Sequence, residues 1–147
     1  MKFKTAAAAA LAVDTILGMG ACGSTDSSSG GKTEIVVWEN STTGDGKKFW
    51  EDAAAAYEKK KPNVHIKIEA IQNEDMDGKL QTALQDPDSA PDVFLARGGQ
   101  KLRDVVEAGQ AMDLTDKISD TVKTQMKTAL AADTIDGKIY GVPQSVL

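Results

Sequence analysis

The order of strand-like and helix-like segments is the feature that most constrains how this chain can fold. From residue 33 onward, short β-branched or aromatic runs alternate with longer segments whose apolar residues recur at helical spacing. The run TEIVVW at 33–38 precedes a polar loop, an amphipathic segment over 47–61 that Pro62 ends, and a second strand-like run at 64–71. Strands that alternate with helices predict an α/β fold with a parallel sheet flanked by helices.

The second half of the chain continues the alternation. Acidic residues at 73–78 resemble half of a calcium loop, but position 12 is Leu84 instead of a bidentate Glu, so this stretch is expected to begin an amphipathic helix. A third strand is predicted over 92–96, and a helix follows that stops at Gly109. Apolar residues then recur every four positions over 114–130, which predicts one helix capped by Thr115. A turn at 136–138 leads into an extended segment over 139–143.

Three side chains that are able to bind ligands have simpler expected roles. Trp50 and Tyr57 lie on the apolar side of the segment over 47–61, so we expect them in the core and not stacked on a ligand. His65 is the only histidine and lies on the polar side of its strand, which favours a solvated residue over a metal ligand or general base. The sequence therefore predicts no metal site and no cofactor.

The carboxyl ends of the predicted strands are the expected binding site. Ligands of parallel α/β sheets bind beyond these ends. In this chain they are the segments 38–41 (Trp-Glu-Asn-Ser) and 96–99 (Ala-Arg-Gly-Gly).

The first 32 residues have the outline of an export signal and a tether. Lys2 and Lys4 precede an apolar run that is too short to span a membrane. The segment Met-Gly-Ala-Cys at 19–22 resembles the bacterial lipobox, with Met at the usual Leu position. The resemblance implies that residues 1–21 are a lipoprotein signal peptide and that Cys22 carries a diacylglycerol, after which 22–32 form a flexible Ser/Gly tether. The alternative is an ordinary signal peptide ending near Ala21, with Cys22 a free thiol.

Composition excludes several classes of protein. The 147 residues carry a net charge of −5, so no basic face is available to neutralise the phosphates of a nucleic acid or an anionic membrane surface. Cys22 is the only cysteine, which rules out an intramolecular disulfide. The segment 33–147 is long enough for about one domain.

A family resemblance covers residues 16–147. Its pieces are the lipobox, IVVW, KKKPNVHIKIE, KLQTAL, PDVF, VEAGQAMDLTD and DGKIYGVPQS, in this order. Together they resemble the extracellular solute-binding proteins of ATP-binding-cassette (ABC) importers, in particular the carbohydrate-type group that includes maltose-binding protein. The resemblance implies the class II periplasmic-binding-protein-like fold, of which 33–147 would be an incomplete N-terminal lobe, truncated before the second lobe.

The same resemblance implies a function and a site. The chain would capture a sugar or oligosaccharide outside the membrane, as a lipid-anchored protein on the extracytoplasmic face, and would deliver it to the permease subunits of the importer. The loops after the first and third strands would line the cleft, and Gln144 would lie at the hinge or cleft edge. The implied ligand-binding residues are Glu39, Asn40, Ser41, Arg97 and Gln144.

Two other classes of function stay open on the sequence. A surface-anchored enzyme acting on carbohydrate would need paired carboxylates, for which Glu39 with Asp92 or Asp113 can be nominated. A structural envelope lipoprotein needs no site at all. Among solutes, peptides, polyamines and anions stay open beside carbohydrate.

Overall fold

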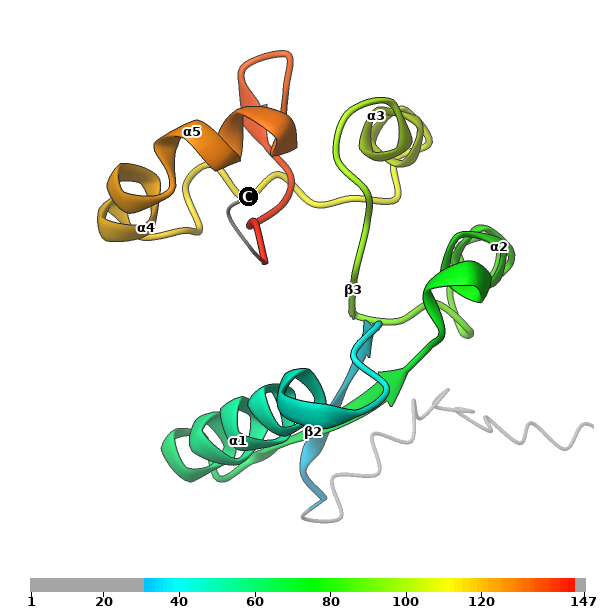
Figure 1. The fold of residues 1–147 in the computed structure, drawn as a ribbon, viewed down its shortest axis with the longest axis vertical. Helices are drawn as coiled ribbons and strands as arrows, with labels where there is room; N and C mark the ends of the chain where they lie inside the picture. Colours follow the sequence, from blue (N-terminus) through cyan, green and yellow to red (C-terminus); the bar gives the residue numbers. More distant parts are fainter. Residues whose placement is uncertain (1–30, 145–147) are drawn as a thin grey trace, which may run out of the picture. The chain divides into compact units, whose positions relative to one another are not determined.

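Strand β1 (Thr33–Glu39) is the centre of a three-stranded sheet in the computed structural model, which describes residues 31–144. The predicted signal peptide, Cys22 and all but the last two residues of the tether lie outside the described residues. Strands β2 (Val64–Ala70) and β3 (Val93–Phe94) flank β1, so the strand order is β2-β1-β3 (Figure 1). All three strands run parallel, which confirms the α/β fold class with a parallel sheet.

Strand pairing is long on one side of β1 and short on the other. β2 pairs with β1 over seven positions, from Thr33 opposite Val64 to Glu39 opposite Ala70. β3 pairs only at Val37 and Trp38. Asp92 extends this contact, because its carboxylate accepts a hydrogen bond from Val36 N at 2.8 Å while its own N–H donates to Val36 O at 3.0 Å.

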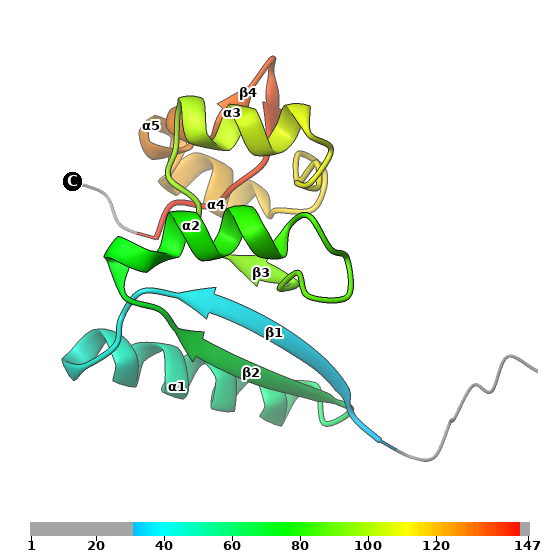
Figure 2. The ribbon, with the colours of Figure 1, turned by 90° about the vertical axis from the view of Figure 1, so that its right-hand side faces the viewer.

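Helices α1 (Gly44–Lys60) and α2 (Asn73–Ala83) make the crossovers between the strands. The chain passes from β1 to β2 on one side and then crosses back over β1 to reach β3. Right-handed crossovers in opposite directions place their helices on opposite faces of a sheet, and Figure 2 shows α1 and α2 on opposite sides of the strands.

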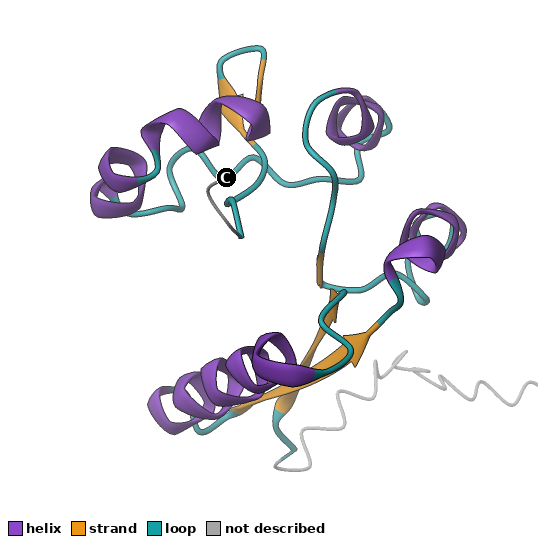
Figure 3. Ribbon diagram, viewed as in Figure 1, coloured by secondary structure: helices purple, strands orange, loops and turns teal. Residues whose placement is uncertain are grey.

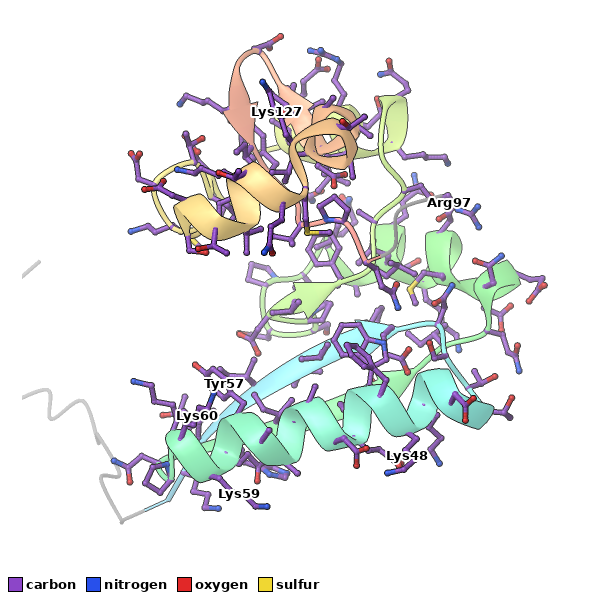
Figure 4. The ribbon with its side chains drawn as sticks, turned by 60° about the vertical axis from the view of Figure 1, so that its left-hand side comes forward. Lys48, Tyr57, Lys59, Lys60, Arg97 and Lys127 are labelled. Atoms are coloured by element: carbon purple, nitrogen blue, oxygen red, sulfur yellow. The ribbon has the colours of Figure 1, made fainter. Side chains whose placement is uncertain are left out.

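Helix α1 touches the sheet through a narrow stripe. Trp50, Ala54 and Glu58, spaced four residues apart, are half-buried, and no residue of α1 is fully buried. The predicted core position of Tyr57 is wrong: its side chain is 47% exposed, next to Lys59 and Lys60 at the end of the helix (Figure 4). Tyr57 directly precedes Glu58 on the helix and therefore points away from the stripe that faces the sheet, into solvent.

The Glu58 side chain accepts a hydrogen bond from β2, which is an edge strand of the sheet. Its Oε1 accepts a hydrogen bond from Ile66 N at 2.7 Å and lies 3.0 Å from His65 Nδ1. The bond from Ile66 lowers the pKa of Glu58, with a smaller contribution from His65. A backbone N–H of an edge strand is thereby satisfied within the chain, and His65 is exposed on its strand as predicted.

The rest of the described chain consists of short helices, loops and one hairpin. Helix α3 (Gln100–Glu107) leads to α4 (Asp120–Gln125), α5 (Lys127–Leu130) and the 3₁₀ turn η1 (Ala131–Asp133). Strands β4 (Thr134–Ile135) and β5 (Lys138–Ile139) pair antiparallel. Figure 3 shows this hairpin as a strand pair separate from the sheet, so the predicted extended segment over 139–143 belongs only partly to a strand.

The predicted single helix over 115–130 is wrong. Ser119 is the actual N-cap, with Oγ accepting from Val122 N, and the backbone of Met126 (φ −107°, ψ 18°) separates α4 from α5. Thr115 is engaged elsewhere: its N–H and hydroxyl both donate to Asp113 Oδ1, and its Oγ1 accepts from Ile139 N at 3.0 Å. These bonds tie residues 113–115 to the hairpin, and only a single turn follows, in which Lys117 N and Ile118 N both donate to Leu114 O.

Few side chains are fully buried. Within residues 31–144, Glu39 is the only buried polar residue. No helix within the described range is both long and apolar enough to cross a bilayer. The buried apolar residues come from the sheet, from α2 and its lead-in, and from α3, α5 and β4: Val37, Ile71, Met76, Leu80, Ala83, Leu102, Leu130 and Ile135.

Replacing Met76 should test this sparse core. The Met76 side chain is 2% exposed, so Met76→Ala should lower the free energy of unfolding by about 2–5 kcal/mol through lost burial and a cavity. Met112 is 67% exposed, so the matched variant Met112→Ala should change it by less than about 0.5 kcal/mol. Urea denaturation of both variants measures the difference, and equal effects would contradict this core.

Asp113 should make stability depend on acid pH. Hydrogen bonds from the Thr115 hydroxyl and N–H, with Lys138 Nζ at 3.2 Å, lower the pKa of Asp113 from 3.8 to about 2. A lowered carboxyl pKa stabilises the fold above the unfolded value and loses that effect as pH falls through the folded value. Asp113→Asn should therefore be less stable than the wild type at pH 7, and the gap should close between about pH 4 and pH 2.

The matched control for this prediction is Asp116→Asn, three residues away on an exposed turn. Its effect on stability should be small and should not vary over the same pH window. A gap for Asp113→Asn that stays constant down to pH 2 would show that the ionised carboxylate contributes nothing.

Candidate functional site

The carboxyl ends of all three sheet strands meet at one edge of the sheet. Ile71 N, just beyond β2, donates to Glu39 O at 2.8 Å, and Leu95 N, just beyond β3, donates to Trp38 O at 2.9 Å. These bonds hold the chain on either side of the end of β1. The residues that follow each strand are therefore neighbours, as parallel pairing requires.

Three polar residues that follow these ends, together with Asp77 of α2, form one hydrogen-bonded group, which we call the strand-end cluster: Asn40, Asn73, Asp77 and Arg97. Asn73 Oδ1 is its centre, accepting from Asn40 Nδ2 at 3.4 Å and from Arg97 Nη2 at 3.2 Å. Arg97 Nε also donates to Asp77 Oδ1 at 3.3 Å. One amide oxygen thus links the segments that follow β1, β2 and β3.

The cluster is open to solvent. The side chains of Arg97 and Asp77 are 53% and 43% exposed, and Lys101 Nζ lies 3.7 Å from Asp77 Oδ2. Figure 4 shows Arg97 on the loop between β3 and α3. Exposed ion pairs of this kind stabilise a fold little, so these groups can exchange partners with a ligand at small cost.

A hollow of about 280 Å³ between α2 and α3 adjoins the cluster. Asp77 and Arg97 line it together with the apolar side chains of Leu80 and Leu84. Gln110 Nε2 donates to Leu84 O at 2.7 Å and so joins the segment after α3 to the end of α2.

Glu39 and Ser41 lie next to the cluster but play a different part. Glu39 is 1% exposed, and its Oε2 accepts a hydrogen bond from Ser41 N. The other carboxylate oxygen, Oε1, is buried without a partner among the described residues. A Cβ on Gly46 would lie 2.8 Å from Ser41 Oγ, so only glycine lets the first turn of α1 approach this loop.

Gln144 is the last described residue and is exposed. Within residues 31–144 the structure records no hydrogen bond between Gln144 and the other predicted site residues. Of the five predicted ligand-binding residues, the structure therefore joins Asn40 to Arg97 through Asn73, pairs Glu39 with Ser41, and leaves Gln144 apart.

Asn73 and Asp77 are the site residues that the sequence reasoning missed. The stretch 73–78 was interpreted only as the start of a helix, and α2 does begin at Asn73. The sequence does carry a signal for Asn73, which is its position after a strand. Asn73 follows the second strand just as Asn40 and Arg97 follow the first and third.

The carboxylates nominated for an enzyme have structural partners. Glu39 bonds Ser41 N, Asp92 bonds Val36 N, and Asp113 bonds Thr115. Each of these carboxylates thus holds a backbone or hydroxyl group, and these contacts lend the enzyme alternative no support.

Comparison with known sequences identifies similar proteins. The sequence profile of the family described as bacterial extracellular solute-binding protein matches residues 40–146. The galactooligosaccharide-binding protein of Bacillus subtilis (strain 168) is 34% identical over 139 residues, which cover 88% of this chain and 30% of that protein.

Solved structures show the same similarity. A protein studied for xylan utilization by Caldanaerobius polysaccharolyticus matches with a TM-score of 0.67 and 28% identity, over 75% of this chain and 28% of its own. An ABC substrate-binding protein from Listeria monocytogenes, in complex with cycloalternan, matches with a TM-score of 0.60 and 32% identity over the same shares. The chain thus spans less than a third of the length of each of these relatives.

Proposed function

Since the chain belongs to the family of bacterial extracellular solute-binding proteins, we propose that it serves an ABC importer by capturing a carbohydrate, most specifically an oligosaccharide, outside the membrane. The observation that carries this proposal is the strand-end cluster, placed where sheets of this class bind ligands. The relatives that bind galactooligosaccharide and cycloalternan support an oligosaccharide as the solute.

The cluster has the chemistry that sugar hydroxyls need. A hydroxyl both donates and accepts hydrogen bonds, an Asn amide does the same, and the Arg guanidinium offers several donors in a fixed plane. Asp77 Oδ1 lies 3.3 Å from Arg97 Nε and its Oδ2 lies 3.7 Å from Lys101 Nζ, so charges of both signs are present. The similarity to proteins that bind galactooligosaccharide and cycloalternan favours an uncharged sugar over a peptide, a polyamine or an anion.

The proposal includes the domain organisation and partners implied by the sequence. Residues 1–21 act as a lipoprotein signal peptide, 22–32 as a lipidated tether, and 33–147 as the N-terminal part of a two-lobed receptor of class II type. The membrane partners are permease subunits, which receive the solute. The chain itself catalyses no reaction.

Sugar titration of the full chain should test the proposed site. Maltotetraose, mannotriose and a galactooligosaccharide should shift NMR signals of residues around Asn40 and Arg97. Asn73→Ala removes the central acceptor and should weaken binding about two- to tenfold, as expected for one hydrogen bond. Asn63→Ala is the matched control, because Asn63 lies at the amino end of the sheet and should leave binding unchanged.

The same titration separates the classes of function. Binding without change to the sugar supports a receptor, and release of shorter sugars would support the enzyme alternative. Silence towards every sugar, both of this chain and of the same chain extended by a second lobe, would favour a structural lipoprotein.

Mass spectrometry should test the lipid anchor. After expression in a bacterium, the N-terminal peptide should begin at Cys22 and carry acyl chains, since two chains hold a protein stably at a membrane. Cys22→Ser removes the only thiol and should move the chain from the membrane fraction to the soluble fraction. An exported chain with unmodified Cys22 would contradict the anchor.

A further inference from the structure

Four exposed lysines lie at the amino end of the sheet, and we call them the lysine patch: Lys32, Lys59, Lys60 and Lys61. Helix α1 ends at Lys60, and the turn that follows leads to β2, where Val64 N donates to Lys61 O at 3.0 Å. Thr33 N donates to Asn63 O at 2.8 Å and thereby attaches the start of β1 to the same turn. These bonds bring Lys32, just before β1, to the same end of the fold as the other three lysines.

The patch lysines have no ion pair recorded within residues 31–144. Near the other end of α1, Lys47 and Lys48 each pair with a carboxylate one turn later, at 3.5 and 2.7 Å. Figure 4 shows Lys59 and Lys60 together at one end of the helix and Lys48 towards the other. A positive charge in the last turn of a helix stabilises that end, which accounts for Lys59 and Lys60 but not for Lys32.

Fewer negative charges surround the patch. The carboxylates of β1 and α1 at this end are Glu34, which lies opposite His65 in the sheet, and Glu58, which lies 3.0 Å from the His65 ring. Lys67 and Glu69, further along β2, pair with each other at 2.6 Å. The acidic residues that follow α2 belong to the opposite face of the sheet from α1 (Figure 2). The net charge of −5 predicts no basic face for the chain as a whole, and the patch is a local exception.

The tether of the proposed function joins the fold at this same end. It runs from Cys22 to Lys32, directly before β1. A flexible Ser/Gly chain of this length spans roughly 20 Å on average. Helix α1, with 17 residues, is about 25 Å long. The patch is therefore held nearer to the lipid anchor than the length of the helix that carries most of it.

We propose that the lysine patch docks on the anionic phospholipid headgroups of the membrane that holds the lipid anchor. This inference rests on the anchor of the proposed function. One lysine near an anionic lipid surface strengthens binding only about fivefold, so the patch is too weak to bring the free chain to a membrane. The tether supplies a millimolar local concentration, and an anchor together with a basic patch makes a stable attachment.

Docking by this end fixes which side of the fold faces outward. The parallel strands begin at the patch, and the strand-end cluster lies beyond their carboxyl ends. Strand β1 has seven residues and separates the two by roughly 20 Å. The lobe would therefore lie on the membrane with its proposed solute site directed away from the lipid.

Vesicle sedimentation tests the patch without relying on lipidation in the cell. Cys22 is the only thiol, so a maleimide that carries one myristoyl-length chain can be joined to it in the processed chain, which begins at Cys22. A single chain of this kind gives reversible binding that can be measured. Lys59→Gln, Lys60→Gln and Lys61→Gln together should weaken binding to phosphatidylglycerol vesicles about ten- to a hundredfold. On phosphatidylcholine vesicles, or in high salt, the loss should vanish.

Two matched variants separate the patch from net charge and from folding. Lys47→Gln, Lys48→Gln and Lys127→Gln together change the net charge equally but lie outside the patch, so binding should change less than about threefold, because salt screens distant charges. Arginine at positions 59, 60 and 61 keeps the positive charges and should bind as the wild type does.

The outcomes separate this inference from the proposed function. Equal binding of the two glutamine variants to phosphatidylglycerol vesicles overturns the inference alone, and so does an arginine variant that binds as weakly as the glutamine variant of the patch. Neither result bears on sugar binding. Unmodified Cys22 in the exported chain, measured by mass spectrometry, overturns the anchor of the proposed function and the docking that rests on it.

Discussion

The parallel pairing of β1 with a neighbour on each side is the constraint on which the other features depend. Backbone bonds from Ile71 to Glu39 and from Leu95 to Trp38 hold the chain just beyond β2 and β3 against the end of β1. Because parallel strands end at the same edge, the polar residue that follows each strand arrives at one place. β3 pairs at only two positions, so the bonds of Asp92 to Val36 carry much of its attachment.

Local sequence patterns predict the strands and helices of the first two-thirds of this fold correctly. The strands, α1, α2 and α3 lie where alternation and helical spacing placed them, and the relatives confirm the class II periplasmic-binding-protein fold and the family. The strand-end rule points to the segments 38–41 and 96–99, and the family resemblance singles out Asn40 and Arg97 within them. The strand-end rule also applies to Asn73, which follows β2. Its acidic neighbours predict the start of a helix, and a residue can both begin a helix and belong to the strand-end cluster.

The remaining errors share a physical cause, which is that tertiary contacts override local pattern. Spacing of four residues over 114–130 satisfies a helix, yet Thr115 bonds to Asp113 and to Ile139, and the helix starts later at Ser119. Tyr57 matches an amphipathic helix, yet the sheet accepts only a narrower stripe of α1. The local sequence does not show that Thr115 will bond to Ile139 of the hairpin. It also does not show how many residues of α1 will face the sheet.

Glu39 and the strand-end cluster show that one edge of the sheet combines a buried, fixed polar group with exposed ones. Side chains two residues apart on a strand share a face, so Glu39 points the same way as buried Val37 and becomes buried itself. Its carboxylate then fixes Ser41 N and shapes the loop from within. Asn40, one position further, points the other way and reaches Asn73 and, through it, exposed Arg97. The end of one strand thus separates the residue that holds the loop from the residue that joins the strand-end cluster.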